Sequence, residues 1–215
     1  MIKNSTISLF LFTLLFQSIN AQTTIDSTTL NKEFTNLEEA LKDPDHVIRL
    51  NLSNQSLQLS DSIWAKFKNL QYLSLKNDHL KIIPEGIGML KNLKELDLSG
   101  NDFKVLPSTF GGLSNLQELY LNDDKNFQLD KNIPILSMLP NLKSLHIEND
   151  GLKKLPKNIF MLNHLESLYL NNNEFKQVPL EIQELKNLKY LDLHDNKFKH
   201  TNQFNPEGFG LKIRF

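Results

Sequence analysis

The sequence predicts an α/β solenoid whose short parallel strands line a concave face, and three observations lead to this prediction. A pattern of the form L-x-x-L-x-L occurs in seven copies, in which only Val or Ile replaces a leucine. The copies start 23, 23, 23, 26, 23 and 23 residues apart, so one structural unit recurs along most of the chain. The segments on either side have the patterns of caps, which cover the apolar ends that a solenoid would otherwise expose.

The spacing of the leucines within a copy predicts a β-strand. In the copy "LKELDLSGNDF", Leu96 and Leu98 are two residues apart, so both side chains point to one face of a strand. A chain that crosses a back face and returns in the same direction builds a parallel ladder. One unit cannot bury its leucines alone, but stacked neighbours can, and seven copies exceed the roughly three that stacking requires.

The second half of each unit predicts a convex face of extended and 3₁₀ segments. Prolines recur there in register, at Pro84, Pro107, Pro156 and Pro179. Proline fixes φ and favours extended geometry in the preceding residue, and a unit of 23 residues leaves little room for a long helix. The unit with three extra residues is the exception, because we expect a short helix there over 131–138, with Asp130 as its N-cap.

These copies resemble the leucine-rich repeat family. They read "VIRLNLSNQSL", "LQYLSLKNDHL", "LKELDLSGNDF", "LQELYLNDDKN", "LKSLHIENDGL", "LESLYLNNNEF" and "LKYLDLHDNKF". The resemblance covers about residues 47–198 and their flanks, and the lead-in "TNLEEALKDPDHVIRLNL" resembles that of secreted Bacteroidetes-type leucine-rich repeat proteins. It implies a solenoid with a parallel sheet on its concave face, and a function in binding a protein partner.

One turn position departs from the pattern of the family, in which it is usually asparagine. Here the seven units have Gln55, Asp78, Asn101, Asp124, Asp150, Asn173 and Asn196. An asparagine side chain both donates and accepts hydrogen bonds, whereas an ionised aspartate can only accept. We therefore expect an interrupted hydrogen-bond ladder and a looser solenoid in the aspartate units.

The N-terminal segments predict export followed by a helical cap. Residues 1–21 have a lysine near the start, an apolar run too short to span a bilayer, and a small residue, Ala21, at the expected cleavage site. Residues 22–30 are polar and predict a disordered lead-in. Residues 31–46 predict a helical N-cap in which Thr35 and Glu38 form a capping box.

Residues 47–201 contain the seven repeats, and residues 202–215 predict a final strand that caps the core. In this strand, apolar residues alternate with Lys212 and Arg214, whose charges would protect its exposed edge from pairing with another chain.

Composition excludes several kinds of chemistry. The chain has no cysteine and a net charge of −1, so it has no disulfides or thiolate sites and no global attraction to nucleic acid or anionic membranes. No catalytic or phosphate-binding signature is present. His194 and His200 lie near each other, but zinc needs three or four converging ligands, so we expect neither metal nor cofactor.

The exposed face of the strands is therefore the candidate functional surface. Counted from the first residue of each copy, positions 3, 5, 7 and 8 should face the concave side. These positions hold all four tyrosines of the chain and seven acidic residues, but only two of its 24 lysines and arginines, Arg49 and Lys76, which gives a formal charge of −5. The candidate partner-binding residues are Tyr72, Glu95, Asp97, Glu118, Tyr120, His146, Tyr169, Tyr190, Asp192 and His194.

Two neighbouring glutamates single out the middle of this face. Glu95 and Glu118 should lie side by side on adjacent strands, where like charges destabilise a sheet. A face that keeps such a pair beside aromatic side chains is typical of a binding surface. The same pair could serve as the acid and base of a glycosidase, but an open face excludes no water.

The function predicted is a non-enzymatic module that binds a basic protein or peptide across its concave face, in the periplasm, at the cell surface or outside the cell. We expect no nucleic-acid partner and no membrane-spanning segment in the mature chain. A carbohydrate-binding surface protein is one alternative, because tyrosines beside acids and amides also bind sugars. An intracellular, cytoplasmic signalling scaffold is another, if the N-terminal segment is not a signal peptide.

Overall fold

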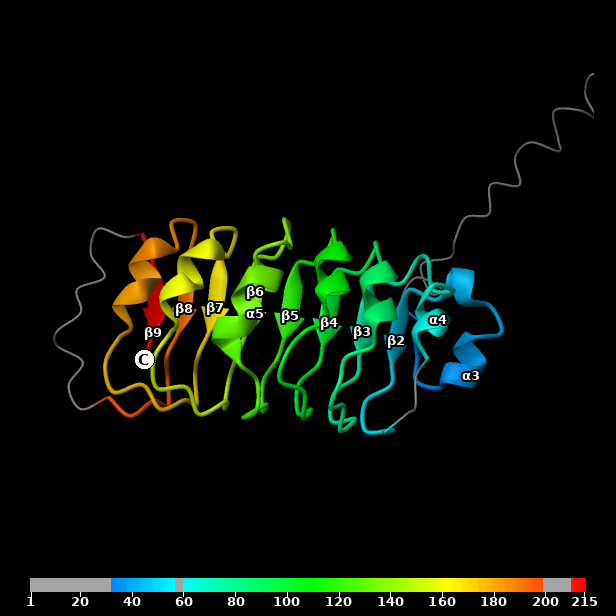
Figure 1. Ribbon diagram of the computed structural model, residues 1–215, viewed down its shortest axis with the longest axis horizontal. Coiled ribbons are helices and arrows are strands. Elements are labelled where there is room, and N and C mark those ends of the chain that lie inside the picture. The colour runs from blue at the N-terminus through cyan, green and yellow to red at the C-terminus, as the bar shows by residue number, and fades with distance from the viewer. Residues whose placement is uncertain (1–31, 57–59, 199–209) are drawn as a thin grey trace, which may run out of the picture. The chain divides into compact units, whose positions relative to one another are not determined.

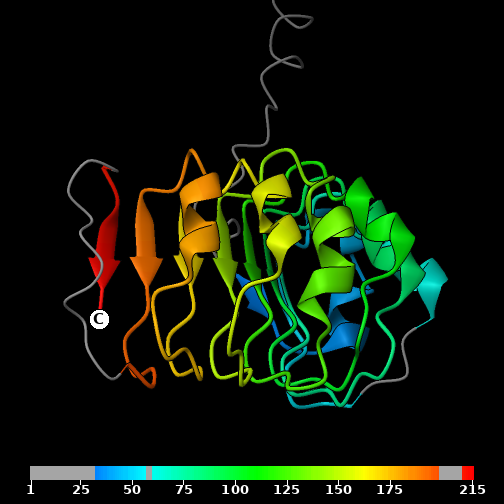
Figure 2. The same ribbon diagram turned by 60° about the vertical axis from the view of Figure 1, so that its left-hand side comes forward.

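The computed structural model describes residues 32–56, 60–198 and 210–215. The segments predicted to be a signal peptide and a lead-in, and His200, lie outside these ranges. The described residues from Glu33 onwards form one compact unit, in which nine strands make a parallel sheet in chain order, β1 to β9. Figures 1 and 2 show these strands side by side along the unit, so the predicted parallel solenoid is confirmed.

The strands are short and equally spaced along the repeats. They are β1 (Glu33–Phe34), β2 (Arg49–Asn51), β3 (Tyr72–Ser74), β4 (Glu95–Asp97), β5 (Glu118–Tyr120), β6 (Ser144–His146), β7 (Ser167–Tyr169), β8 (Tyr190–Asp192) and β9 (Lys212–Arg214). The helical segments are α3 (Leu37–Ala40), α4 (Asp61–Trp64), α5 (Leu129–Leu136) and the 3₁₀ turns η1 (Pro44–His46), η2 (Glu85–Met89), η3 (Ser108–Gly112), η4 (Lys157–Met161) and η5 (Leu180–Glu184).

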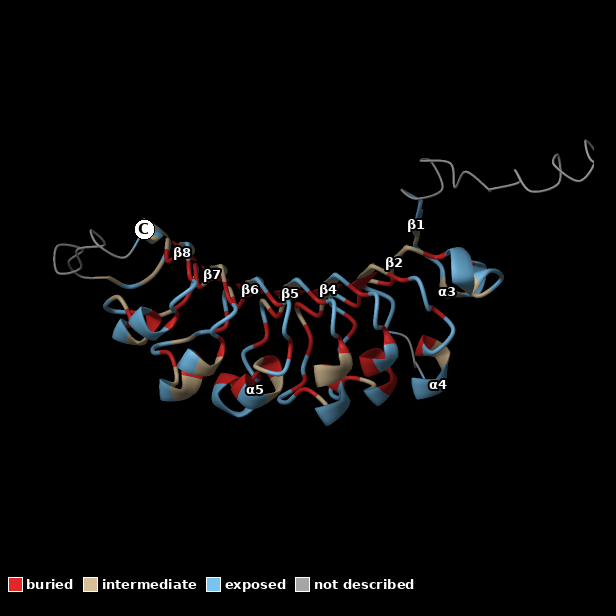
Figure 3. Ribbon diagram, turned by 90° about the horizontal axis from the view of Figure 1, so that it is seen from above, coloured by how far each residue is buried: buried red, intermediate tan, exposed pale blue. Residues whose placement is uncertain are grey.

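The leucines of the repeat form continuous columns in the core. Leu96 pairs in register with Leu73 on one side and Leu119 on the other, and all three are fully buried. Figure 3 shows the strands along the inner side of a shallow arc and the helical segments along its outer side. Residues that flank each buried leucine therefore point out of the sheet on the concave side.

The convex side has the expected 3₁₀ turns, which begin after the recurring prolines. Pro84, Pro107, Pro156 and Pro179 immediately precede η2, η3, η4 and η5. Gly86 and Gly88 let η2 approach its neighbours closely, because an added Cβ would lie only 2.1 Å from the carbonyl oxygen of Asp61 or Thr109. This glycine pair therefore sets the packing distance between successive coils.

The predicted boundaries of two helices were wrong. α5 starts at Leu129 rather than residue 131, and Asp130 lies in its first turn instead of capping it. This start places Leu129, Ile133 and Leu136 on one buried face, and that burial outweighs the cap.

In the N-terminal cap, Asn36 rather than Thr35 is the N-cap of α3, and its Oδ1 accepts a hydrogen bond of 2.9 Å from the backbone N–H of Glu39. The residues just before it form β1, a strand that the sequence did not reveal. β1 pairs with β2 in parallel and extends the sheet by one strand at its N-terminal end.

The turn ladder is interrupted where asparagine is replaced. Asn101 Nδ2 donates to the carbonyls of Leu75 and Leu98, at 2.9 and 2.7 Å, while its Oδ1 accepts from the backbone of Asp78 and Leu80. Asp150 accepts only from the backbone N–H of Asp124, and its buried Oδ2 has no hydrogen-bond partner.

Burial is the main reason that two carboxyl groups of this ladder, those of Asp150 and Asp124, have raised pKa values. It raises the pKa of Asp150 to about 8 and that of Asp124 to about 6. The strands β5 and β6 nevertheless pair through three residues, as their neighbours do. The expected loosening of the solenoid at these units stays a prediction about its dynamics.

Candidate binding face

Two rows of side chains cross the concave face, the first from β1 to β9 and the second from β2 to β9. The first row, at position 3, contains Glu33, Arg49, Tyr72, Glu95, Glu118, Ser144, Ser167, Tyr190 and Lys212. The second row, at position 5, contains Asn51, Ser74, Asp97, Tyr120, His146, Tyr169, Asp192 and Arg214. Glu33, Lys212 and Arg214 belong to strands outside the seven copies, which is why the repeat pattern missed them.

Three rings of the second row form a continuous stack. The centroids of Tyr120 and His146 are 4.0 Å apart, as are those of His146 and Tyr169, with interplanar angles of 21° and 6°. Tyr190, in the first row, is tilted by 52° against Tyr169 at 5.4 Å. The stack follows from the register, because parallel strands place equivalent side chains about 4.8 Å apart. We refer to Tyr120, His146 and Tyr169 as the ring stack.

Two glutamates hold the central imidazole of the ring stack. His146 Nε2 lies 3.0 Å from Glu118 Oε1, and Nδ1 lies 3.2 Å from Glu148 Oε1. Tyr120 donates its hydroxyl to the same Glu118 oxygen at 2.8 Å. Only 9% of the His146 side chain is exposed. His146 is therefore enclosed between the two tyrosines, which are more exposed and are left to contact a partner.

The protonation state of Tyr120 follows from the same contacts. Burial, together with the hydrogen bond to Glu118 and the charge of that group, raises the pKa of the Tyr120 phenol far above its usual value. The hydroxyl therefore remains a hydrogen-bond donor over the whole physiological pH range.

The acidic group predicted in the middle of the face is present. Glu95 and Glu118 are register neighbours, and Asp97 follows Glu95 on the same strand. Burial, and then the charge of Glu118, raise the pKa of Glu95. Asp97 accepts a hydrogen bond of 2.9 Å from the backbone N–H of Ser99. Among the described residues, no lysine, arginine or histidine forms an ion pair with Glu95 or Asp97.

The two ends of the face contain cations of the chain itself. At the N-terminal end, the Arg49 guanidinium lies 3.9 Å from the centroid of the Tyr72 ring and 3.3 Å from Glu33 Oε1. At the C-terminal end, Lys212 Nζ lies 5.9 Å from the centroid of the Tyr190 ring. The concave face is therefore acidic in its middle and carries positive charges towards its ends.

Asp192 lies beneath the surface and not on it. The residue is 3% exposed, and its carboxylate contacts His194 Nδ1 at 2.6 Å, the Tyr190 hydroxyl at 3.0 Å and Arg214 at 3.4 Å. Burial acts to raise the pKa of Asp192, but the hydrogen bonds from His194 and Tyr190 outweigh it and lower the pKa below its usual value. Asp192 and His194 thus connect β8 to β9 and the loop that follows β8.

Position 8 has a structural explanation that the sequence analysis missed. Its seven residues all have positive φ, between 53° and 69°, and are Asn54, Asn77, Gly100, Asp123, Asn149, Asn172 and Asp195. Only Gly, Asn and Asp adopt this left-handed region readily, so the turn selects them. The charges of Asp123 and Asp195 therefore reflect the turn and not the binding face. The restriction of this position to Gly, Asn and Asp is the feature of the sequence that could have revealed the left-handed turn.

The predicted residues thus divide into two groups. Eight of them are half-buried, with side chains that reach the surface, and these are Tyr72, Glu95, Asp97, Glu118, Tyr120, Tyr169, Tyr190 and His194. His146 and Asp192 are buried. The half-buried residues follow one another on neighbouring strands from β3 to β5 and again from β7 to β8. The ring stack, which extends from β5 to β7, connects these two groups.

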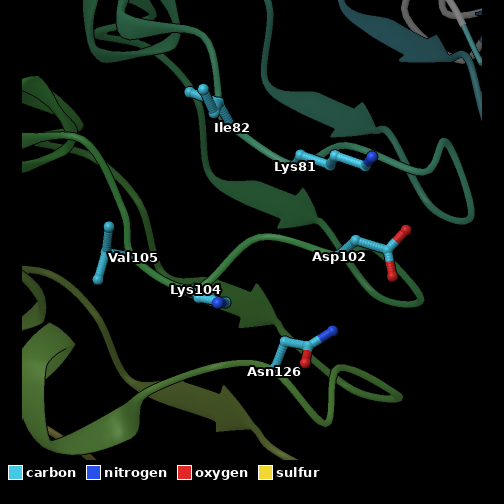
Figure 4. Close-up of a pocket in the computed structure, with 6 residues that line it drawn as sticks. All are labelled: Lys81, Ile82, Asp102, Lys104, Val105 and Asn126. Carbon is cyan, nitrogen blue, oxygen red and sulfur yellow. The ribbon is translucent and has the colours of Figure 1, made fainter.

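Two hollows in the described part of the chain lie away from this face. One of about 560 Å³ is lined by Lys81, Ile82, Asp102, Lys104, Val105 and Asn126, from the connections that follow β3, β4 and β5. Figure 4 shows these side chains spread along successive coils and not directed at a common point. Another, of about 530 Å³, lies among α4, η2 and η3 on the convex side and includes Met89 and Lys91.

The described ranges contain neither a cluster of metal ligands nor a helix that could span a membrane. Within residues 32–56, 60–198 and 210–215, no three His, Asp or Glu side chains are placed to hold a metal ion. No helix in those ranges has the length and apolar character needed to cross a bilayer.

Several solved structures are similar to this chain. The Toll–Spatzle complex from Drosophila matches with a TM-score of 0.65 and 18% identity, over 77% of this chain and 22% of that one. An internalin, InlF, from Listeria monocytogenes matches with a TM-score of 0.56 and 22% identity, over 77% of this chain and 46% of the internalin. The TLR13–ssRNA13 complex matches with a TM-score of 0.67 and 29% identity, over 83% of this chain and 26% of that one. The chain spans less than half the length of each of these proteins.

Family models match most of the repeat region. A model described as a leucine-rich repeat region matches residues 45–149, and two leucine-rich repeat models match residues 140–198 and 187–211. The search of curated proteins found no match. The family models and the nine-stranded parallel solenoid agree, and the chain belongs to the leucine-rich repeat family.

Proposed function

We propose that this chain is a non-enzymatic module that holds an extended, basic segment of a protein or peptide across its concave face. The proposal rests mainly on the acidic group of Glu95 and Asp97 beside the ring stack, which forms no ion pair with any cation among the described residues. Leucine-rich repeat folds are commonly protein-binding modules, and aromatic side chains are frequent anchors in protein interfaces. The basic character of the partner rests on charge complementarity.

The geometry of the ring stack favours a peptide over a sugar. Sugars stack on the flat faces of aromatic rings, but His146 covers one face of Tyr120 and one face of Tyr169 at 4.0 Å. Each of these two tyrosines therefore has at most one ring face left for a sugar, whereas the acidic group beside Tyr120 suits the charged side chains of a basic peptide. The acidic middle of the face also repels phosphates, which argues against an RNA ligand of the kind present in the TLR13 complex.

The proposal predicts that charges control association and tyrosines control dissociation. A basic peptide is first selected from a random library on the wild-type chain, and its rates are measured by surface plasmon resonance. Reversing Glu95 and Glu118 to lysine should slow association and flatten its salt dependence, because surface charges act over about 8 Å at physiological salt. Tyr169→Ala should speed release, because losing an anchor typically costs about 2 kcal/mol or more.

The matched control is the pair Lys104 and Lys153. Lys104 lines the hollow on the flank, and Lys153 lies 3.6 Å from Glu174, away from the strand rows. Replacing both with alanine should leave binding unchanged. If this change weakens binding as much as Tyr169→Ala, the partner binds elsewhere. If a neutral oligosaccharide binds the face without salt dependence, the carbohydrate function replaces the one proposed.

Export is part of the proposal and has its own test. We expect the chain purified from its native host to begin at Gln22, because Ala21 ends a signal-peptide pattern. N-terminal sequencing or intact mass measures this directly. Recovery of a soluble cytosolic form that retains Met1 would favour the intracellular scaffold instead.

A further inference from the structure

The chain places its own cations beside tyrosine rings at both ends of the concave face. Arg49 lies over the Tyr72 ring at 3.9 Å and pairs with Glu33 at 3.3 Å. At the other end, Arg214 pairs with Asp192, whose carboxylate also accepts the hydroxyl of Tyr190. Each end thus combines a tyrosine, a carboxylate and a cation.

The middle of the face has the first two of these components but lacks the third. Tyr120 lies beside Asp97 in the second row, and Glu95 lies beside Glu118 in the first. His146 pairs with Glu118, but no cationic side chain of the described residues lies within ion-pair distance of Glu95 or Asp97. The charge of Arg49 opposes the rise in the pKa of Glu95 but does not cancel the effects of burial and of Glu118. Half-buried carboxylates that face each other in this way are unfavourable, and a ligand cation paired with them would relieve this cost.

The arrangement of the rings leaves a place for such a cation over β4. His146 on β6 covers the face of Tyr120 that is directed away from β4, so the other face of this ring is directed towards β4. Arg49 on β2 likewise covers one face of Tyr72, whose other face is directed towards β4. β4 carries Glu95 and Asp97 between these two rings.

We propose that the gap over β4, between Tyr72 and Tyr120, binds an arginine side chain of the partner. This inference rests on the proposed function and names its central contact. A guanidinium is planar, so it stacks on a tyrosine ring while its N–H groups pair with carboxylates in a fork. Arg49 makes this combination of contacts within the chain, with Tyr72 and Glu33. Glu95 and Asp97 supply the charge, and Tyr120 supplies the ring.

The experiment uses three probe peptides of equal length, nona-arginine, nona-lysine and nona-citrulline, titrated into the full chain by calorimetry at physiological salt. Nona-arginine should bind most tightly. Nona-citrulline, which keeps the planar group without its charge, should not bind detectably. Glu95→Gln should weaken the binding of nona-arginine about tenfold or more, because it removes the negative charge that pairs with the guanidinium and leaves only a neutral hydrogen-bond acceptor. The thermal midpoint of this variant should hold or rise, because a like-charge pair is lost.

Two matched controls separate a specific site from general attraction. Glu184→Gln removes the same charge from η5 on the convex side, where Glu184 is exposed, and should leave binding unchanged. Tyr120→Phe keeps the ring and loses only the hydroxyl bond to Glu118, so it should retain the preference for arginine over lysine. Tyr120→Leu removes the ring and should abolish that preference.

Failure of this site can be told apart from failure of the proposed function. If Tyr169→Ala weakens peptide binding while Glu95→Gln and Tyr120→Leu do not, the concave face binds the partner but the gap over β4 is not an arginine site. If Glu95→Gln and Glu184→Gln weaken nona-arginine equally, binding is general attraction and the site is overturned. If no concave-face variant alters binding, both proposals fall.

Discussion

Replacing Asp150 with asparagine is expected to raise the free energy of unfolding at neutral pH by about 1–3 kcal/mol, the usual cost of a buried polar group without a partner. The Oδ2 atom of Asp150 is buried and has no hydrogen-bond partner. In the equivalent positions, Asn101 and Asn173 use their Nδ2 groups to donate to two backbone carbonyls each. An asparagine at 150 should make the corresponding bonds and complete the ladder.

The gain should depend on pH in a defined direction. Burial raises the pKa of Asp150 to about 8 in the folded chain, whereas an unfolded aspartate titrates near its usual value of about 4. Between these values the folded state holds a proton that the unfolded state releases, so rising pH favours unfolding. The contribution of protonated Asp150 to the stability of the folded state is complete below about pH 4 and is lost as pH rises through about 8. The difference between Asp150→Asn and wild type should therefore widen across this range.

Urea unfolding at several pH values between 4 and 8 measures this difference. The control is the reverse substitution, Asn173→Asp, which introduces a carboxyl group at a position where asparagine makes all its hydrogen bonds. The stability of this variant should fall as pH rises. In the wild type, amide hydrogen exchange should be faster around Asp124 and Asp150 than around Asn173. A gain that is the same at both ends of the pH range, or uniform exchange protection along the ladder, would contradict this account.

The sequence predicted the strands because their periodicity records burial directly. Leu96 and Leu98 are fully buried, and the register of Glu95 with Glu118 followed from counting units of 23 residues. The helix starts were missed because they depend on small energies. A cap contributes about 1 kcal/mol, so burial of Leu129 could move the start of α5 away from Asp130.

The candidate site was predictable as rows of residues but not as contacts. Equal spacing placed Tyr120, His146 and Tyr169 in one row, and their stacking then follows from the distance between strands. The pairing of His146 with Glu118 and Glu148 depends on rotamers, which a repeat pattern does not encode. The ion pair of Arg214 with Asp192 was also missed, because β9 falls outside the copies and Asp192 was assigned to the partner-binding surface.

Replacing Leu96 with alanine is expected to lower the free energy of unfolding by about 2–5 kcal/mol, as other truncations of buried leucines do. Leu96 is fully buried between Leu73 and Leu119, so the cavity cannot be filled from solvent. In a solenoid each unit contacts only its neighbours, so the loss weakens two interfaces at once. Leu145→Ala, in the unit after the insertion, should cost a similar amount for the same reason.

Chemical denaturation followed by circular dichroism measures both changes. Met89→Ala is the control, because this large apolar side chain is 56% exposed on η2, and its loss should change stability by roughly 0.5 kcal/mol or less. If Leu96→Ala costs no more than Met89→Ala, the leucine columns do not carry the core and the strand register is incorrect. The concave rows would then lose their alignment as well, because a shift of one residue moves every side chain of a strand to the opposite face.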